Sequence, residues 1–175
     1  MTCGNLSLLL CRTEKNEQLC GLDMKIFFID GNNLMGKVPS LSSRMNSDRA
    51  GVREDLALRL DSVFYQTNNK VTLFLDGFAG EKIRTNKTEI VYSNARPADI
   101  LIKNAIDRAK NPRNIVVVSS DFEVFNYAKK CYCEAMKSED FIKRYFRNNE
   151  GKEENERISS LEKQQDEFKK LFGIK

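Results

Sequence analysis

The chain has 175 residues, of which 41% are hydrophobic and 31% charged, and its formal net charge is +4 at pH 7. This length and balance predict one globular domain with a full core, and no apolar run is long enough to span a bilayer. Histidine is absent, which excludes Ser-His-Asp catalysis, Cys-His catalysis and every histidine-bound metal site. The short apolar run at 6–10 follows no basic residue, so it makes a poor secretory signal and we expect a cytoplasmic protein without membrane contact.

The positive charge is concentrated in the middle of the chain. Residues 25–147 hold 21 basic and 15 acidic side chains, whereas the segments on either side each carry one net negative charge. A basic surface suits a polyanion such as nucleic acid, although an ordinary solvated surface is the plainer explanation of an excess of this size. The five cysteines show no CxxC spacing, and we interpret all of them as reduced thiols.

The first part of the chain divides at Met24. Residues 1–23 mix Gly, Asn, Glu and Lys without a period, so we expect a disordered N-terminal extension and a native start at Met24. A strand is predicted at 25–29 and a polar loop, rich in Gly, Asn and Ser, at 31–50.

The middle of the chain alternates between helical and strand patterns. A helix is predicted at 51–67, a strand at 70–75, a polar segment at 77–87 and a short strand at 89–92. Further along, the patterns predict a helix from Pro97 to Asn111, a strand at 114–119, a helix from Asp121 to about residue 130, a strand at 132–136 carrying Cys131 and Cys133 on one face, and a helix to Phe146 capped by Ser138.

This order predicts an α/β fold, with helices on both faces of a mostly parallel sheet of about five strands, in residues 24–147. Residues 148–156 are predicted to be a polar linker within a 148–175 tail. The rest of that tail is predicted to be an amphipathic helix that ends at Gly173 and docks on the domain, with docking on a partner as the alternative. Its apolar side consists of Ile158, Leu161, Phe168, Leu171 and Phe172.

Three predicted strands lead into an aspartate, and a fourth aspartate opens a helix. These residues are Asp30, Asp76, Asp121 and, after Pro97, Asp99. Because the carboxyl ends of parallel strands share one edge of a sheet, we expect the four carboxylates to lie together. They would repel one another unless a cation lay among them, and oxygen-only ligands suit Mg²⁺ or Mn²⁺. Each aspartate alone has a structural explanation as a turn or cap residue, but their joint placement indicates phosphate-ester chemistry, with a nuclease as the first candidate.

The loop after the first strand supports this interpretation. It reads Ile29-Asp30-Gly31-Asn32-Asn33-Leu34-Met35-Gly36. Gly31 would allow a tight turn and a close approach to a ligand, and Asn33 is a candidate to bind a substrate phosphate or to hold Asp30 in place. An ordinary Gly-Asn turn is the alternative.

This loop resembles the opening motif of NYN-domain proteins of the YacP-like group, within the PIN-like nuclease superfamily. Phe74-Leu75-Asp76-Gly77, Ala98-Asp99 and Ser119-Ser120-Asp121 resemble later motifs of the same family, in the same order. The tail 168–173 is similar as well, and the resemblance covers roughly residues 24–146 plus that tail. It implies the PIN-like NYN three-layer sandwich.

The resemblance also implies a metal-dependent endoribonuclease that hydrolyses RNA phosphodiester bonds and leaves 5′-phosphate and 3′-hydroxyl ends. Asp30, Asp99 and Asp121 would hold Mg²⁺ or Mn²⁺, with Asp76 as a direct or water-mediated ligand. Such a metal acidifies a bound water and stabilises charge on the phosphoryl oxygens. The expected partner is RNA, single-stranded or structured. Association with the ribosome is left open, and we expect a monomer or weak dimer.

Basic residues near the acidic edge are candidates to bind the RNA backbone, although each one alone is more readily a surface charge. They are Lys37, Arg44, Arg49, Arg53, Lys82, Arg84, Lys87 and Arg96. Phe78 and Tyr92 are candidates to stack on bases, but aromatic residues beside strands usually belong to the core.

One departure from the family supports a second hypothesis. The family often has a second acid after the position of Asp99, and here that residue is Ile100. A catalytically weak RNA-binding or ribosome-associated module with the same fold is therefore the alternative. Glu54 and Asp55 are weak candidates for a further carboxylate. A third hypothesis, a phosphatase or phosphotransferase with a carboxylate nucleophile, usually needs a second aspartate at position 32, which is Asn.

Overall fold

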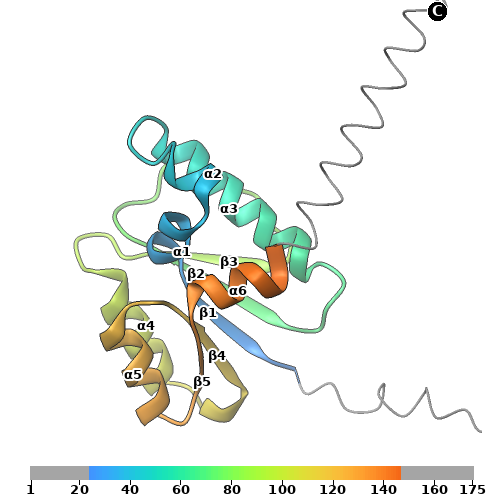
Figure 1. Ribbon diagram of the computed structural model, residues 1–175. Helices are drawn as coiled ribbons and strands as arrows, with labels where there is room; N and C mark the ends of the chain where they lie inside the picture. The colour runs from blue at the N-terminus through green and yellow to red at the C-terminus, as the bar shows by residue number, and fades with distance from the viewer. Residues whose placement is uncertain (1–23, 147–175) are drawn as a thin grey trace, which may run out of the picture.

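The computed structural model describes residues 24–146, which form a single five-stranded sheet with helices on both faces (Figure 1). All four strand pairings are parallel, and the strand order is β3-β2-β1-β4-β5. The predicted α/β class and parallel sheet are confirmed. The strands are β1 (Ile26–Asp30), β2 (Lys70–Leu75), β3 (Thr88–Tyr92), β4 (Ile115–Val118) and β5 (Glu134–Met136).

The helices form two layers, one on each face of the sheet (Figure 1). One layer consists of α1 (Gly31–Lys37), α2 (Pro39–Ser42), α3 (Arg49–Phe64), α6 (Ser138–Phe141) and the π-helical turn η2 (Ile142–Phe146). The other consists of α4 (Ala98–Asp107) and α5 (Phe122–Lys130), and a 3₁₀ turn η1 (Pro112–Asn114) leads into β4. Within this part of the chain, no helix has the length and apolar character needed to cross a membrane.

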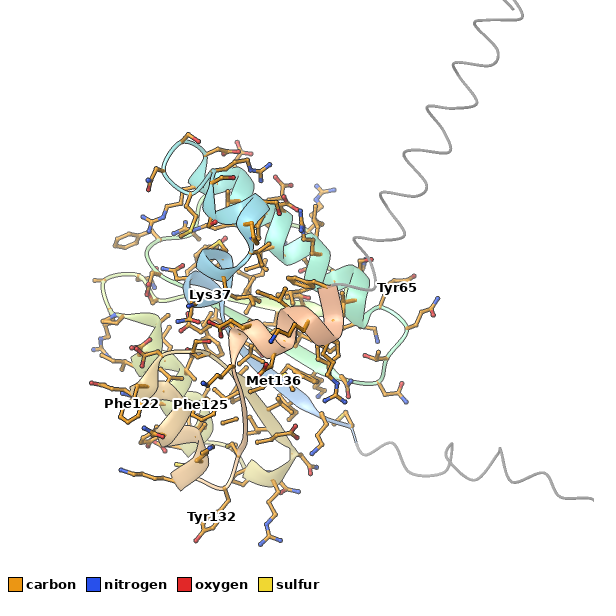
Figure 2. The ribbon with its side chains drawn as sticks, in the orientation of Figure 1. Lys37, Tyr65, Phe122, Phe125, Tyr132 and Met136 are labelled. Carbon is orange, nitrogen blue, oxygen red and sulfur yellow. The ribbon has the colours of Figure 1, made fainter. Side chains whose placement is uncertain are left out.

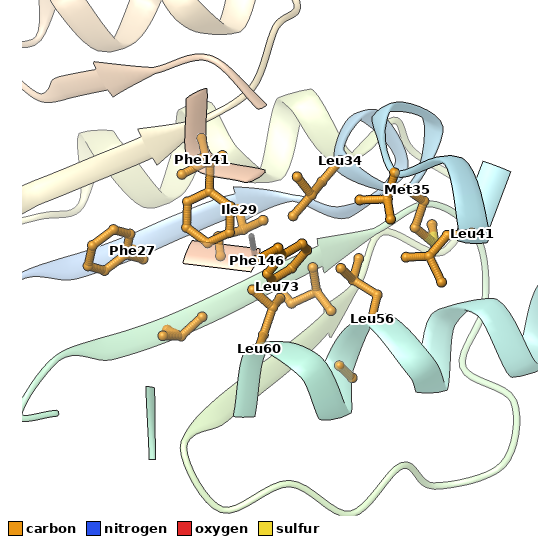
Figure 3. Packing of buried hydrophobic residues seen from close by; sticks show 14 of the residues in the cluster. Phe27, Ile29, Leu34, Met35, Leu41, Leu56, Leu60, Leu73, Phe141 and Phe146 are labelled. Carbon is orange, nitrogen blue, oxygen red and sulfur yellow. The ribbon is translucent and has the colours of Figure 1, made fainter. Parts of the chain in front are cut away.

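The core is divided by the sheet because successive side chains of a strand point to opposite faces. Phe27 and Ile29 of β1 pack into the cluster under α1, α3 and α6, whereas Phe28 packs into the cluster under α4 and α5. Figure 3 shows the first cluster, where Leu56 and Leu60 of α3 lie against the sheet. Burial on both faces explains why the central strands read as continuous apolar runs.

The prediction of a polar loop at 31–50 is wrong, because most of this segment forms α1 and α2 and the start of α3. Leu34, Met35, Val38 and Leu41 are buried at helical spacing. Gly31 serves packing here, since a Cβ on it would lie 2.5 Å from Cδ2 of Leu75 and 2.8 Å from the carbonyl oxygen of Phe74. The close approach that needs glycine is therefore to β2.

Three predictions at element ends are also wrong. The last strand begins at Glu134, because Tyr132 adopts a left-handed turn with φ of 62°. Cys131 and Cys133 therefore lie between α5 and β5, where both are free thiols, and they share no strand face. Ser138 is the first residue of α6 and Lys137 is its cap, while Pro97 precedes α4 as its cap residue. The predicted N-terminal extension and C-terminal helix lie outside the described residues.

One buried carboxylate that the sequence did not reveal fixes the start of β3. Asp61 of α3 is 8% exposed and accepts hydrogen bonds from the backbone N–H groups of Asn86 at 3.0 Å, Lys87 at 2.6 Å and Thr88 at 3.0 Å. Burial alone would raise the pKa of Asp61, but these donors outweigh it and lower the pKa from its ordinary 3.8. Asp61 thus attaches the end of segment 77–87 to α3.

We expect Asp61→Asn to lower the free energy of unfolding at pH 7 by about 2 kcal/mol, since charge-assisted hydrogen bonds become neutral ones. The lowered pKa means that this contribution is present above about pH 4 and is lost as the pH falls through the folded-state value. Urea unfolding from pH 3 to pH 7 should show the gap between mutant and wild type closing at low pH. Asp140→Asn, at an exposed carboxylate, is the control, and an equal loss in both variants would contradict the assignment.

Candidate functional site

The four predicted aspartates meet at the carboxyl edge of the sheet. Asp30 ends β1, Asp76 follows β2, Asp99 lies in the first turn of α4 and Asp121 caps α5. Strands β2, β1 and β4 are neighbours, and the chain reverses its direction across the sheet between β1 and β4. Ligand sites in parallel sheets form at such a reversal. Burial is the main cause of the raised pKa of Asp30, and the negative charges of Asp99 and Asp76 add to it.

Asp30 is the buried member of the group, at 5% exposure. Its Oδ1 accepts a hydrogen bond from the backbone N–H of Asn33 at 3.0 Å, and its Oδ2 accepts one from the Ser119 hydroxyl at 3.0 Å. Burial raises the pKa of Asp30 to about 6, with smaller contributions from the two neighbouring negative charges, although both hydrogen bonds lower it. The fold therefore holds this carboxylate in one orientation in a place that disfavours its charge.

Asp76 and Asp121 also serve as structural caps. Oδ1 of Asp76 accepts a hydrogen bond from the backbone N–H of Ala98 at 2.7 Å, at the start of α4, and its Oδ2 accepts one from the side-chain amide of Asn32. Oδ1 of Asp121 accepts hydrogen bonds from the first turn of α5 at 2.8 and 3.1 Å. The structural explanation is correct for both residues, and the same contacts keep them at the acidic edge.

Asp99 makes the fewest side-chain polar contacts of the four carboxylates within the described residues. Across residues 24–146, its side chain takes part in no hydrogen bond or ion pair, and Lys103, one turn further on, pairs instead with Glu123 at 3.2 Å. Burial raises the pKa of Asp99, the charge of Asp121 adds to this rise, and Lys103 opposes it. Asp99 is thus available to bind a cation or a substrate group.

The donor chemistry of the edge fits a hard cation. No three acidic or cysteine side chains of the described part of the chain converge on one point as a ready-made ion site. Mg²⁺, however, keeps several of its waters and is commonly held by one or two carboxylates together with substrate phosphates. Oδ1 of Asn32 is buried at this edge without a hydrogen-bond partner, so an unused oxygen donor lies beside the carboxylates.

The side-chain oxygen of Asn33 links three elements at the acidic edge. Its Oδ1 accepts hydrogen bonds from the backbone N–H of Ser120 at 2.9 Å and from the Ser138 hydroxyl at 2.8 Å. Its backbone N–H, and not its side chain, holds Asp30. The contact of Asn33 with Asp30 is thus made by the backbone, and the amide oxygen joins α1 to the end of β4 and to α6.

Arg53 has a similar supporting position. Its guanidinium donates to the backbone carbonyl oxygens of Asp76 and, at 3.5 Å, of Phe78, and it lies 5.8 Å from the ring centroid of Tyr92. These contacts shape the turn after β2, where Gly77 has a φ of 85°. Arg53 thus positions Asp76, and the half-buried Tyr92 lies beneath it.

Three further basic candidates are engaged elsewhere. Arg44 pairs with Asp55 at 3.0 Å, and Asp55 also pairs with Arg59 at 2.8 Å, so Asp55 is not a further site carboxylate. Lys37 pairs with Glu139 at 2.9 Å. Lys87 donates to the carbonyl oxygen of Thr67 at 3.2 Å, near the amino end of β2. Among the basic candidates, the exposed residues without such contacts inside the described range are Arg49, Lys82, Arg84 and Arg96.

Segment 77–87 encloses two hollows beside the acidic edge. A cavity of about 690 Å³ separates it from β3 and is lined by Lys82, Arg84 and Tyr92 among others. A smaller one of about 160 Å³ also touches Lys82 and Tyr92 and reaches Arg53. Because Arg53 contacts the backbone carbonyl oxygen of Asp76, the smaller hollow adjoins the turn that carries Asp76. Phe78, 68% exposed, lies in the same segment.

Sequence reasoning missed two residues that support the carboxylates. Ser119 donates to Asp30 and also accepts the backbone N–H of Asp121 at 3.1 Å, so it joins two of the four aspartates. Asn32 donates to Asp76. The signal that could have identified them is their position beside the aspartates in the two motifs that end at the acidic edge.

Comparisons with known proteins agree with this arrangement. The model of the YacP-like NYN domain matches residues 27–172. The crystal structure of Rae1 (YacP) from Bacillus subtilis superposes with a TM-score of 0.57 at 22% identity, covering 86% of this chain and 93% of that one. A tryptophan-to-leucine mutant of Rae1 (YacP) from the same organism gives a TM-score of 0.61 at 17% identity, covering 78% and 83%. At these identities the likeness shows the fold. No curated protein matches significantly.

We expect Asp30→Asn to stabilise the protein in EDTA at pH 7.5. An acid whose pKa rises on folding does not lower the free energy of unfolding at a pH below its ordinary pKa of 3.8. It lowers that free energy by the full amount at a pH above its folded-state pKa of about 6. The asparagine oxygen can accept the hydrogen bond from the Asn33 N–H, and its amide nitrogen can donate to the Ser119 hydroxyl, which reverses that bond. Since the charge is removed, the gain should be about 2–3 kcal/mol at pH 7.5 and vanish near pH 4. Urea unfolding at both pH values tests this, and a mutant that is less stable at pH 7.5 would contradict it.

Proposed function

The chain belongs to the family of YacP-like NYN domains, within the PIN-like nuclease superfamily, and on this premise we propose that it is a metal-dependent endoribonuclease. Membership of the family supports a nuclease acting on RNA in general terms. The observation that carries the more specific proposal is the gathering of four carboxylates at one sheet edge, with negative neighbours contributing to the raised pKa of both Asp30 and Asp99. Such a group is suited to binding a divalent cation.

In this proposal Asp30, Asp99 and Asp121 hold Mg²⁺ or Mn²⁺, with Asp76 bound to it directly or through water. The cation, when bound, offsets the charge that builds up on the phosphate oxygens and acidifies the attacking water. The chain keeps Asp30 in a fixed orientation through Asn33 and Ser119. The water gives up a proton as its oxygen bonds to phosphorus, the bond from phosphorus to O3′ breaks, and O3′ takes up a proton. The products are a 5′-phosphate and a 3′-hydroxyl.

The RNA backbone would approach over segment 77–87 and the start of α4. Lys82 and Arg84 are exposed beside the larger cavity, and Arg96 is exposed three residues before Asp99. Arg49 is exposed at the start of α3. Phosphate contacts from such residues supply most of the affinity for nucleic acid. Ribosome association, a cytoplasmic location and a monomeric or weakly dimeric state stay predictions.

A second candidate function is an RNA-binding module with weak or no catalysis. Ile100, 41% exposed, occupies the position where the family often has an acid. Asp76 and Asp121 are already hydrogen-bonded as caps, which reduces the number of oxygens free to bind a cation. These observations favour weak metal binding, so the experiment must separate cutting from binding.

We expect Mn²⁺-dependent cleavage of single-stranded, hairpin and structured RNAs, leaving 5′-phosphate ends, and its loss in EDTA. Asp99→Asn should lower the rate by at least about 100-fold, since losing a metal ligand should exceed the 10–100-fold effect of losing a group that only orients one. Asp99 is preferred to Asp121 because its side chain caps no helix. Asp107→Asn, at the other end of α4, is the matched control and should keep full activity.

A thermal shift with Mn²⁺ separates the two candidate functions. The wild-type melting temperature should rise with Mn²⁺, and the rise should be lost in Asp99→Asn, because a ligand of the folded state stabilises it. RNA binding by the wild type without any cutting or metal-dependent shift would favour the binding module and make Ile100 its leading explanation.

We expect Lys82→Ala with Arg84→Ala to weaken RNA binding and to reduce the slope of log affinity against log salt by about 1.4, since two phosphate contacts would be lost and each contributes about 0.7 for a single strand. Lys110→Ala with Arg113→Ala, beyond the opposite edge of the sheet, provides a control of equal charge. Filter binding from 50 to 200 mM salt measures both slopes. Equal effects of the two pairs would indicate nonspecific attraction in place of a defined RNA path.

A further inference from the structure

The α5 helix carries an exposed phenylalanine, Phe122, and a half-buried one, Phe125, outside its buried positions. Val124 and Ala128 are the buried residues of this helix. Phe122 is 80% exposed and Phe125 is half-buried. Together with Lys129 they recur at spacings of three and four, which places them along one side of the helix. Phe122 and Lys129 lie away from the buried positions, whereas Phe125 lies at their border, so core formation gives no reason for the exposed ring of Phe122.

This aromatic face begins at the acidic edge. Phe122 directly follows Asp121, and Figure 2 shows Phe122 and Phe125 on the α4–α5 side of the molecule. Across the gap to α4, Lys103 pairs with Glu123 at 3.2 Å. Ile100 is 41% exposed and lies one turn before Lys103. An exposed apolar side chain therefore also lies in the first turn of α4, next to Asp99.

The chemistry of this face fits nucleic acid with unpaired bases. The Nζ atom of Lys129 lies 4.5 Å from the ring centroid of Phe125, so a positive charge accompanies the aromatic pair. Single-stranded nucleic acid is bound by this combination, in which bases stack on aromatic rings and cations contact the backbone. Bases inside a duplex are already stacked and cannot offer their faces to a ring. The adjoining carboxylates make the phosphodiester strand the natural occupant, because the proposed chemistry already brings that strand to this edge.

We propose that Phe122 and Phe125 stack on unpaired bases on one side of the cleaved phosphate, with Lys129 beside the backbone. The inference deepens the proposed function and rests on it for the position of the cleaved bond. It makes the substrate single-stranded at the site, because the enzyme holds the strand by the faces of its bases.

The test uses the full chain in EDTA, so that binding is measured without cleavage. Fluorescence anisotropy compares a labelled single-stranded uridine 12-mer with an RNA duplex of the same length. Phe122→Ala should weaken binding of the single strand roughly tenfold and leave duplex binding unchanged, since stacking on one base contributes about 1–3 kcal/mol. Phe122→Tyr keeps the ring and should bind the single strand as the wild type does.

Tyr132→Ala is the matched control, because Tyr132 is 77% exposed and lies in the turn between α5 and β5, at the far end of α5 (Figure 2). It should change neither affinity. Unchanged single-strand binding by Phe122→Ala, as expected if a protein segment covers this face, would overturn the proposal, and so would an equal loss for duplex and single strand.

The outcome is separable from that of the nuclease proposal. If the wild type cuts no RNA but Phe122→Ala weakens single-strand binding, the stacking proposal stands and the nuclease proposal fails. If the protein cuts RNA and binds the single strand equally well with and without the Phe122 ring, the nuclease proposal stands and the stacking proposal fails.

Discussion

The structure depends on a carboxylate buried at the end of its central strand. Each oxygen of Asp30 accepts one hydrogen bond, from the first turn of α1 on one side and from the end of β4 on the other. The group that the proposed chemistry needs therefore also fixes the two elements next to it. Its charge is unfavourable there, and the apolar packing on both faces of β1 offsets that cost. A site of this kind lowers the free energy of unfolding, but it holds a metal-binding carboxylate in position before the metal arrives.

Around Asp30, polar side chains hold the other carboxylates in place. The Asn33 amide oxygen links α1 to Ser120 and Ser138, and Ser120 lies next to Asp121. The Arg53 guanidinium holds the backbone on which Asp76 is carried. Asn33 and Arg53, which the sequence suggests for substrate binding, thus position the carboxylates. The exposed residues of segment 77–87 and α5 remain accessible to a large ligand.

The sheet and its acidic edge could be predicted because their signals are local. Continuous β-branched runs identify buried parallel strands, and parallel order alone brings their last residues together. The helical nature of α1 could not be predicted, because it depends on a cap from Asp30 and on burial against β2. The role of Asn33 depends on Ser138, 105 residues later in the sequence. Asp61 likewise acts on residues 25 to 27 positions away, and no local pattern reveals such a partner.

The connection from β2 to β3 has a consequence for how this fold can diversify. Because β3 is parallel to β2, the chain must run back from the end of β2 to the start of β3. The length of the five-residue β3 is about 17 Å, which roughly five extended residues can span, whereas segment 77–87 contains eleven residues. The surplus forms the outer wall of the larger cavity, and Asp61 fixes its far end. Residues could be gained or lost between Ala79 and Arg84 without shifting the register of β3 on β2. The number of residues in this connection can therefore change the width of the neighbouring cavity without moving the four carboxylates.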